Sequence, residues 1–157
     1  MDGLRNVLNK FLNFLGAVTF AAMVLLTCWQ VLTRYVLGNP SSWSEELVSY
    51  LFAWATLIGA CVVSGERGHM NIPIVVEKMG ENAQKIFKIF AEVIAFLFSG
   101  IILTYGGVQI TSLAMGQLTS SLGVAIGVFY IILPVCGIVN MLYSILNVID
   151  ICKGKEA

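Results

Sequence analysis

Four long stretches of mostly apolar residues determine what this chain can fold into. A helix that crosses the hydrocarbon core of a bilayer needs about 20 such residues, and within that core each backbone polar group must be paired inside the helix. We therefore expect an all-α integral membrane protein, with residues 1–157 forming a single four-helix membrane domain. The four predicted spans run from about Phe11 to Tyr35, Leu47 to Ser64, Ile89 to Met115 and Val124 to Ile149. The last two are long for a ~30 Å core, so we expect tilt or a kink, for which Pro134 offers a place.

The composition agrees with a lipid environment and excludes several functions. Hydrophobic residues make up 58% of the chain and charged residues 11%, whereas a soluble domain has about 25% charged residues. The net charge is zero, so we expect no basic face for nucleic acid. The cysteines lack metal-ligand spacing, and the single histidine, His69, cannot hold a haem from both sides. Without a nucleophile–base pair or a midplane carboxylate dyad, we expect no enzyme, no cofactor and no metal site.

The distribution of positive charge predicts the orientation. Lysine and arginine concentrate on the cytoplasmic side of membrane proteins. Both termini and the loop after the second span are therefore expected in the cytoplasm, and the connections 36–46 and 116–123 on the outer side. Within the cytoplasmic loop, Pro73 and Gly80 bracket a predicted short interfacial helix. The cations on the predicted inner side are Arg5, Lys10, Arg67, Lys78, Lys85, Lys88, Lys153 and Lys155, against Arg34 alone on the other side.

The stretch NPSSWSEELVSYLFAW, residues 39–54, places two acids at the edge of the second span. Ser42 and Glu45 have the spacing of a capping box, which explains Glu45 as part of a helix start. Glu46 is not explained in this way. At helical spacing it shares a stripe with Trp43, Tyr50 and Trp54, and an acid at the membrane edge usually seeks a protein partner. Either this stripe contacts another protein, or Trp43 is an ordinary interfacial anchor.

Three further residues leave alternatives open. Arg34 can form an ion pair with Glu45 or Glu46 that ties the first two spans together, or it can pair with a partner chain. Glu92 can pair with Lys88, four residues earlier. Alternatively, Glu92 is the proton-coupled acid of a small homodimeric multidrug exporter, although its position near the start of the third span disfavours that hypothesis. His69 is expected in a turn or at the level of the lipid headgroups.

The order of these residues resembles the small membrane subunit of tripartite ATP-independent periplasmic (TRAP) transporters, the DctQ-type protein. The resemblance is carried by RYVLGNPSSWSEELVSYLFAWATLIGACVVSGERGHMNI and by SSLGVAIGVFYIILPVCGIVNMLYSI near the last span. The positions that match the family pattern are Arg34, Trp43, Glu45, Glu46, Trp54, Gly59 and His69.

The resemblance implies a division of labour in a sodium-coupled uptake system for organic acids in the bacterial inner membrane. A periplasmic binding protein captures the solute, a large many-span subunit moves it, and the small subunit packs against the large one within the bilayer. We therefore predict a partner interface that includes Arg34, Trp43, Glu45, Glu46, Tyr50, Trp54 and His69.

Overall fold

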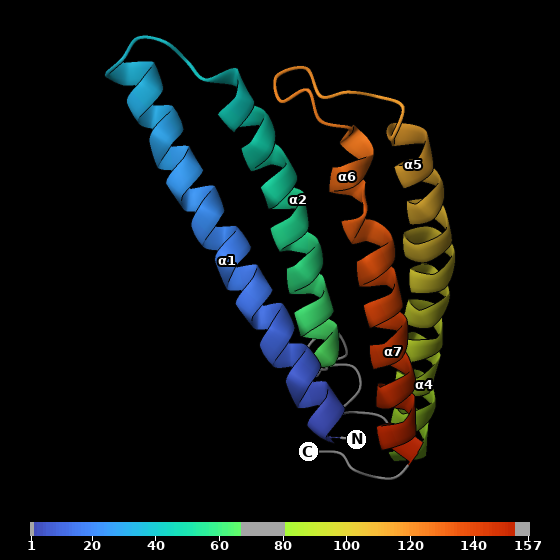
Figure 1. Cartoon of the computed structure of the whole chain (residues 1–157). Helices are drawn as coiled ribbons and strands as arrows, with labels where there is room; N and C mark the ends of the chain where they lie inside the picture. Colours follow the sequence, from blue (N-terminus) through green and yellow to red (C-terminus); the bar gives the residue numbers. More distant parts are fainter. Residues whose placement is uncertain (1, 67–80, 153–157) are drawn as a thin grey trace.

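The computed structural model describes residues 2–66 and 81–152, and this part of the chain is almost entirely helical (Figure 1). Within these described residues, four stretches are long and apolar enough to cross a membrane, which confirms the prediction of an all-α protein with four spans. The predicted interfacial helix at residues 73–80 lies outside the described residues, and the cytoplasmic location of the termini stays a prediction. The elements are α1 (Asp2–Tyr35), α2 (Ser42–Gly65), α4 (Glu81–Phe98), the π-helix η2 (Ser99–Gly106), α5 (Gly107–Ala114), α6 (Ile126–Tyr130) and α7 (Ile132–Cys152).

The first helix is longer than its apolar run. It begins at Asp2 rather than near Phe11, because polar residues in its first turns lower the local hydropathy without breaking the helix. Leu8, Leu12 and Leu15 recur at helical spacing and pack against the core, as expected for an amphipathic start.

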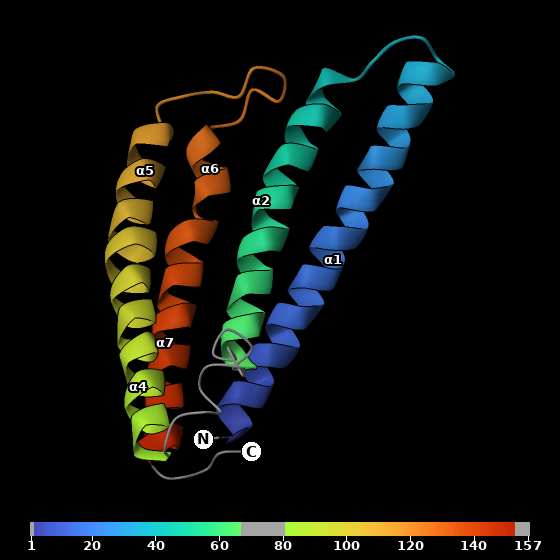
Figure 2. The same ribbon diagram turned by 180° about the vertical axis from the view of Figure 1, so that it is seen from behind.

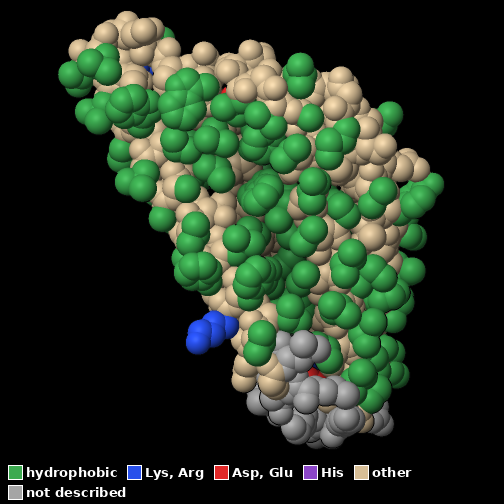
Figure 3. Space-filling model, viewed as in Figure 1, with side chains coloured by type: hydrophobic (Ala, Val, Ile, Leu, Met, Phe, Trp, Pro, Cys, Tyr) green, Lys and Arg blue, Asp and Glu red, His purple; other side chains and the backbone are tan. Residues whose placement is uncertain are grey.

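The four spans lie in an open row (Figures 1 and 2). α1 packs on α2, α2 on α7, and α7 on α4 and η2, while α5 packs on α6 and α7. The first and third spans are thus the outer members, and the row has two broad faces. Figure 3 shows hydrophobic side chains from one end of a face to the other. Only 11% of the most apolar window of each of the first three spans is buried, against 28% in the fourth, so lipid or another protein must cover the remainder.

The core lies where α1, α2 and α7 meet. Ile58 and Cys61 of α2 are 1% and 0% exposed, and they pack with Leu12 of α1 and with Cys136 and Tyr143 of α7. The core therefore holds the second and fourth spans together as the middle of the row.

Two irregularities interrupt the later spans. The fourth span breaks at Ile131, between α6 and α7, three residues before Pro134, whose ring has no N–H to donate and clashes with the preceding turn. The predicted kink is therefore present. The third span contains the π-helix η2, in which the hydroxyl of Thr104 donates to the carbonyl of Ser99 at 2.9 Å.

Glycines allow the third and fourth spans to approach closely. A Cβ at Gly107 would lie 3.0 Å from Pro134, and one at Gly127 would lie 2.6 Å from the Thr111 carbonyl. Small residues at such contacts are common between membrane helices. Gly123, in the connecting loop, has another role, since it takes a positive φ of 66°.

Candidate partner interface and the polar contacts that shape it

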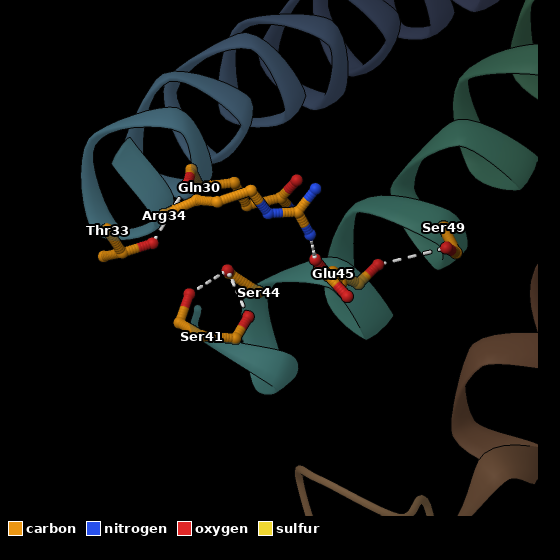
Figure 4. A network of polar contacts seen from close by, with 7 residues as sticks. All are labelled: Gln30, Thr33, Arg34, Ser41, Ser44, Glu45 and Ser49. Carbon is orange, nitrogen blue, oxygen red and sulfur yellow. Dashed lines mark hydrogen bonds and ion pairs between the residues drawn. The ribbon is translucent and has the colours of Figure 1, made fainter. Parts of the chain in front are cut away.

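Two serines pair with each other at the start of α2 (Figure 4). The N-cap is Ser41, in an extended conformation, and its side chain makes no capping hydrogen bond to the helix backbone. The hydroxyl of Ser44 donates to the Ser41 carbonyl at 2.8 Å and also pairs with the Ser41 hydroxyl. The predicted capping box of Ser42 and Glu45 is therefore wrong, because the helix begins one residue earlier than that motif requires and Glu45 turns to another partner.

That partner is Arg34, at the end of α1. The guanidinium donates to the Glu45 carboxylate and joins the first two spans across their short connection (Figure 4). Of the two alternatives for Arg34, the ion pair that ties the first two spans together is therefore confirmed. The two side chains are 55% and 47% exposed, so the pair contributes only about 0–1 kcal/mol to stability. Because both side chains are exposed, their charges remain accessible at the end of the spans where α1 meets α2.

Glu46 holds the loop between α5 and α6. Its carboxylate accepts a hydrogen bond from the backbone N–H of Ser121 at 2.9 Å. That loop is also closed by backbone bonds from Thr119 N–H to the Val124 carbonyl at 2.8 Å and from Ile126 N–H to the Gln117 carbonyl at 2.9 Å. Glu46 therefore links the start of α2 to the loop between α5 and α6.

Two aromatic residues of α2 meet α6 below this loop. The Tyr50 ring stacks on Phe129, with centroids 4.1 Å apart and planes 6° from parallel. The indole N–H of Trp54 donates to the Phe129 carbonyl at 2.8 Å, close to the helix break at Ile131. Together with Glu46, these contacts hold α2 against the upper part of the fourth span.

The predicted interface residues therefore fall into groups. Those engaged within the chain are Glu46, Tyr50 and Trp54. Those exposed at the same end are Arg34, Trp43 and Glu45. His69 lies outside the described residues. Binding of a partner by any of these residues stays a prediction, but the exposed group is the part of the surface that remains accessible to one.

At the other end of the four spans, away from the loop that Glu46 holds, lies a buried polar network that was not predicted from the sequence. Asn147 of α7 is at its centre and is 3% exposed. Its amide N–H₂ donates to the Glu92 carboxylate at 2.6 Å and to the Ser64 carbonyl at 3.2 Å. Arg5 donates to the Asn147 side-chain oxygen and, at 3.2 Å, to Asp150. The network thus joins all four spans at one level.

A helical pattern in the sequence carried the signal for this network. Tyr143, Asn147 and Asp150 recur at i, i+4 and i+7 in an otherwise apolar span, and polar groups at such positions usually find partners within the protein. The Tyr143 hydroxyl donates to Asn9 of α1, and both side chains press on Gly65 of α2, where a Cβ would lie 2.6 Å from the Asn9 oxygen.

The network also bears on Glu92. This side chain is 4% exposed, and its carboxylate accepts the Asn147 hydrogen bond within a single chain. Such engagement argues against the exporter hypothesis, which needs an acid available to substrate and proton. Among residues 2–66 and 81–152, no three histidine, cysteine or acidic side chains are grouped as a metal site would require.

Comparison with known proteins identifies the family. The family model described as tripartite ATP-independent periplasmic transporters, DctQ component, matches residues 23–154. The chain is 27% identical to the sialic acid TRAP transporter small permease protein SiaQ of Vibrio cholerae over 150 residues, 96% of this chain and 86% of that protein. It is 28% identical to the C4-dicarboxylate TRAP transporter small permease protein DctQ of the same organism over 91 residues, 58% of this chain and 39% of that protein.

A longer relative is also informative. The sialic acid TRAP transporter permease protein SiaT of Haemophilus influenzae is 28% identical over 99 residues, which are 63% of this chain but only 16% of that protein. A segment similar to this chain is thus part of a much longer permease. With four apolar spans, the residue pattern of the second span and a family match over most of its length, the chain belongs to the DctQ family of TRAP transporter components, which are small permease subunits and not enzymes.

Proposed function

We propose that this chain is the scaffold subunit of a sodium-coupled, binding-protein-dependent uptake transporter for an organic acid in the bacterial inner membrane. Two relatives are named as small permease proteins of a sialic acid and of a C4-dicarboxylate TRAP transporter, and both solutes are organic acids. This supports an anionic, carboxylate-bearing substrate for the complex. We assign the substrate and sodium sites to the large subunit, because the polar network of this chain is engaged in joining its own helices.

The observation that carries the proposal is the open row of helices. In each of the four spans of the described chain, most of the apolar window is not buried. A row presents one face to lipid while the other is available to a second membrane protein. The similarity to a segment of the longer permease SiaT supports the same arrangement, since in that protein such a segment is covalently attached to the rest of the permease. We therefore propose a large many-span permease as the direct partner.

The exposed residues at the loop end suggest where the outer-side contacts are made. We propose that Trp43 and the Arg34–Glu45 pair contact the large permease or the periplasmic binding protein, and that His69 also takes part in binding a partner. Glu46, Tyr50 and Trp54 act indirectly, because they hold the loop and α6 in the shape that a partner meets.

The proposal is tested by copurification and transport. A tagged chain is extracted from native membranes in mild detergent, and its partners are identified by mass. We expect a stoichiometric many-span membrane protein, and uptake of an organic acid into proteoliposomes that needs both chains and an inward sodium gradient. Recovery of the chain alone as a homodimer would contradict the proposal. So would sodium-driven uptake by the large protein at the same rate without this chain.

A further inference from the structure

A groove of about 280 Å³ lies between α4 and α7. Its lining residues belong to the half of the spans that contains the start of α1 and the end of α7, as these helices are placed in Figure 1. Its apolar walls are formed by Val93, Phe96 and Leu97 of α4 and by Ile145, Val148 and Ile149 of α7. It is open along its outer side, where Val93, Leu97 and Ile145 are 46%, 51% and 47% exposed. The groove is therefore accessible from the membrane.

Glu92 and Ser144 also line the groove, but they add almost no polar surface to it. They are 4% and 5% exposed, and the Glu92 carboxylate accepts the Asn147 hydrogen bond. An apolar wall over a satisfied carboxylate suits a hydrocarbon chain rather than a cation or a polar solute.

Positive charge lies at one end of the groove. Lys85 is exposed and stands seven residues before Glu92, so the two share a face of α4 and are separated by about 10 Å along the helix axis. Lys88 lies between them on the same face. Half of the hydrocarbon core is about 15 Å deep, so a molecule with its phosphate at Lys85 would place its acyl chain along the groove.

We propose that the α4–α7 groove binds one acyl chain of an anionic phospholipid whose phosphate is held by Lys85. Basic residues at the ends of membrane helices attract anionic headgroups, and the apolar groove selects an attached chain over a free anion. The occupant is thus a lipid of the cytoplasmic leaflet, given the predicted orientation of the chain.

Native mass spectrometry of the delipidated full chain tests the proposal. The probes are phosphatidylglycerol and phosphatidylcholine with identical acyl chains, and glycerol 3-phosphate as the headgroup without a chain. We expect preferential retention of phosphatidylglycerol, and Lys85→Gln is expected to reduce this preference about five-fold. Lys10→Gln, which removes an exposed lysine of α1, is the matched control and is expected to leave it unchanged.

A second pair of variants tests the groove itself. Val93→Phe fills the groove and is expected to reduce retention of both lipids, whereas Val108→Phe, on an exposed position of α5, is not. Equal retention of the two lipids by the unaltered chain, or competition by glycerol 3-phosphate, would overturn the proposal. Loss of the lipid when the large permease copurifies would overturn it as well, because the groove would then be a protein interface.

Discussion

Replacing Asn147 by alanine is the most direct test of the network that joins the four spans. The side chain takes part in three hydrogen bonds, with Arg5, the Ser64 carbonyl and Glu92. Hydrogen bonds between membrane helices contribute about 0.6 kcal/mol on average and up to about 1.7, so the three together contribute about 2 kcal/mol. Glu92 then loses a donor while buried, which adds about 1–3 kcal/mol. We expect Asn147→Ala to lower the free energy of unfolding by about 3–5 kcal/mol.

Asn140 provides a matched control on the same helix. It lies two turns earlier on α7 and is half-buried, and its side-chain oxygen has no hydrogen-bond partner in the described part of the chain. Asn140→Ala removes the same atoms without removing that network, so we expect a loss below about 1 kcal/mol. The free energies are measured by reversible unfolding in mixed micelles, with helicity as the signal. Equal losses for Asn140→Ala and Asn147→Ala would refute the reasoning, because the cost would then come from packing alone.

Two further comparisons use residues with contrasting surroundings. Gly127→Ala is expected to destabilise the fold by about 1–3 kcal/mol, because its Cβ would meet the backbone of the third span. Gly59→Ala places its Cβ in open space and is expected to be neutral or to stabilise the fold by up to about 1 kcal/mol. Both are measured in the same unfolding assay, and an equal effect of the two variants would contradict the close packing at Gly127. Glu46→Ala is expected to speed hydrogen exchange at the Ser121 amide several-fold, because it removes the acceptor of that N–H. Glu45→Ala removes only an exposed ion pair and should leave exchange at that amide unchanged. Unchanged exchange in both variants would show that Glu46 does not hold the loop.

The sequence predicted the spans well because hydropathy over 20 residues is a strong signal. It also located the break in the fourth span, since Pro134 cannot donate to the preceding turn. The helix α1 extends nine residues before the predicted span, to Asp2, because polar first turns lower hydropathy even where a leucine stripe continues the helix. The π-helix η2 had no counterpart in the prediction, because an i→i+5 pattern depends on how α7 packs against the span rather than on local residues.

The candidate interface was predicted less completely. The sequence drew attention to the acids and aromatic residues of α2, but it did not predict the contacts that Glu46, Tyr50 and Trp54 make within the chain. Trp54 and Glu46 bond to backbone groups, the Phe129 carbonyl and the Ser121 N–H, and backbone groups carry no sequence signal. The buried network was missed for a different reason. Arg5 was interpreted only as an orienting charge, and its long side chain reaches Asn147 on the last span.

The row of spans has a consequence for how the protein is assembled in the bilayer. The first and second spans are neighbours in both chain and space, and so are the third and fourth, with short connections at 36–41 and 115–125. Each pair can therefore insert and close as a hairpin with mostly local contacts, which form quickly. The seam between α2 and α7 pairs elements far apart in the chain, so it is the step in which two finished hairpins meet. Cys61, Tyr143 and Asn147 lie in or beside that seam, and their side chains thus govern the last stage of folding rather than the first.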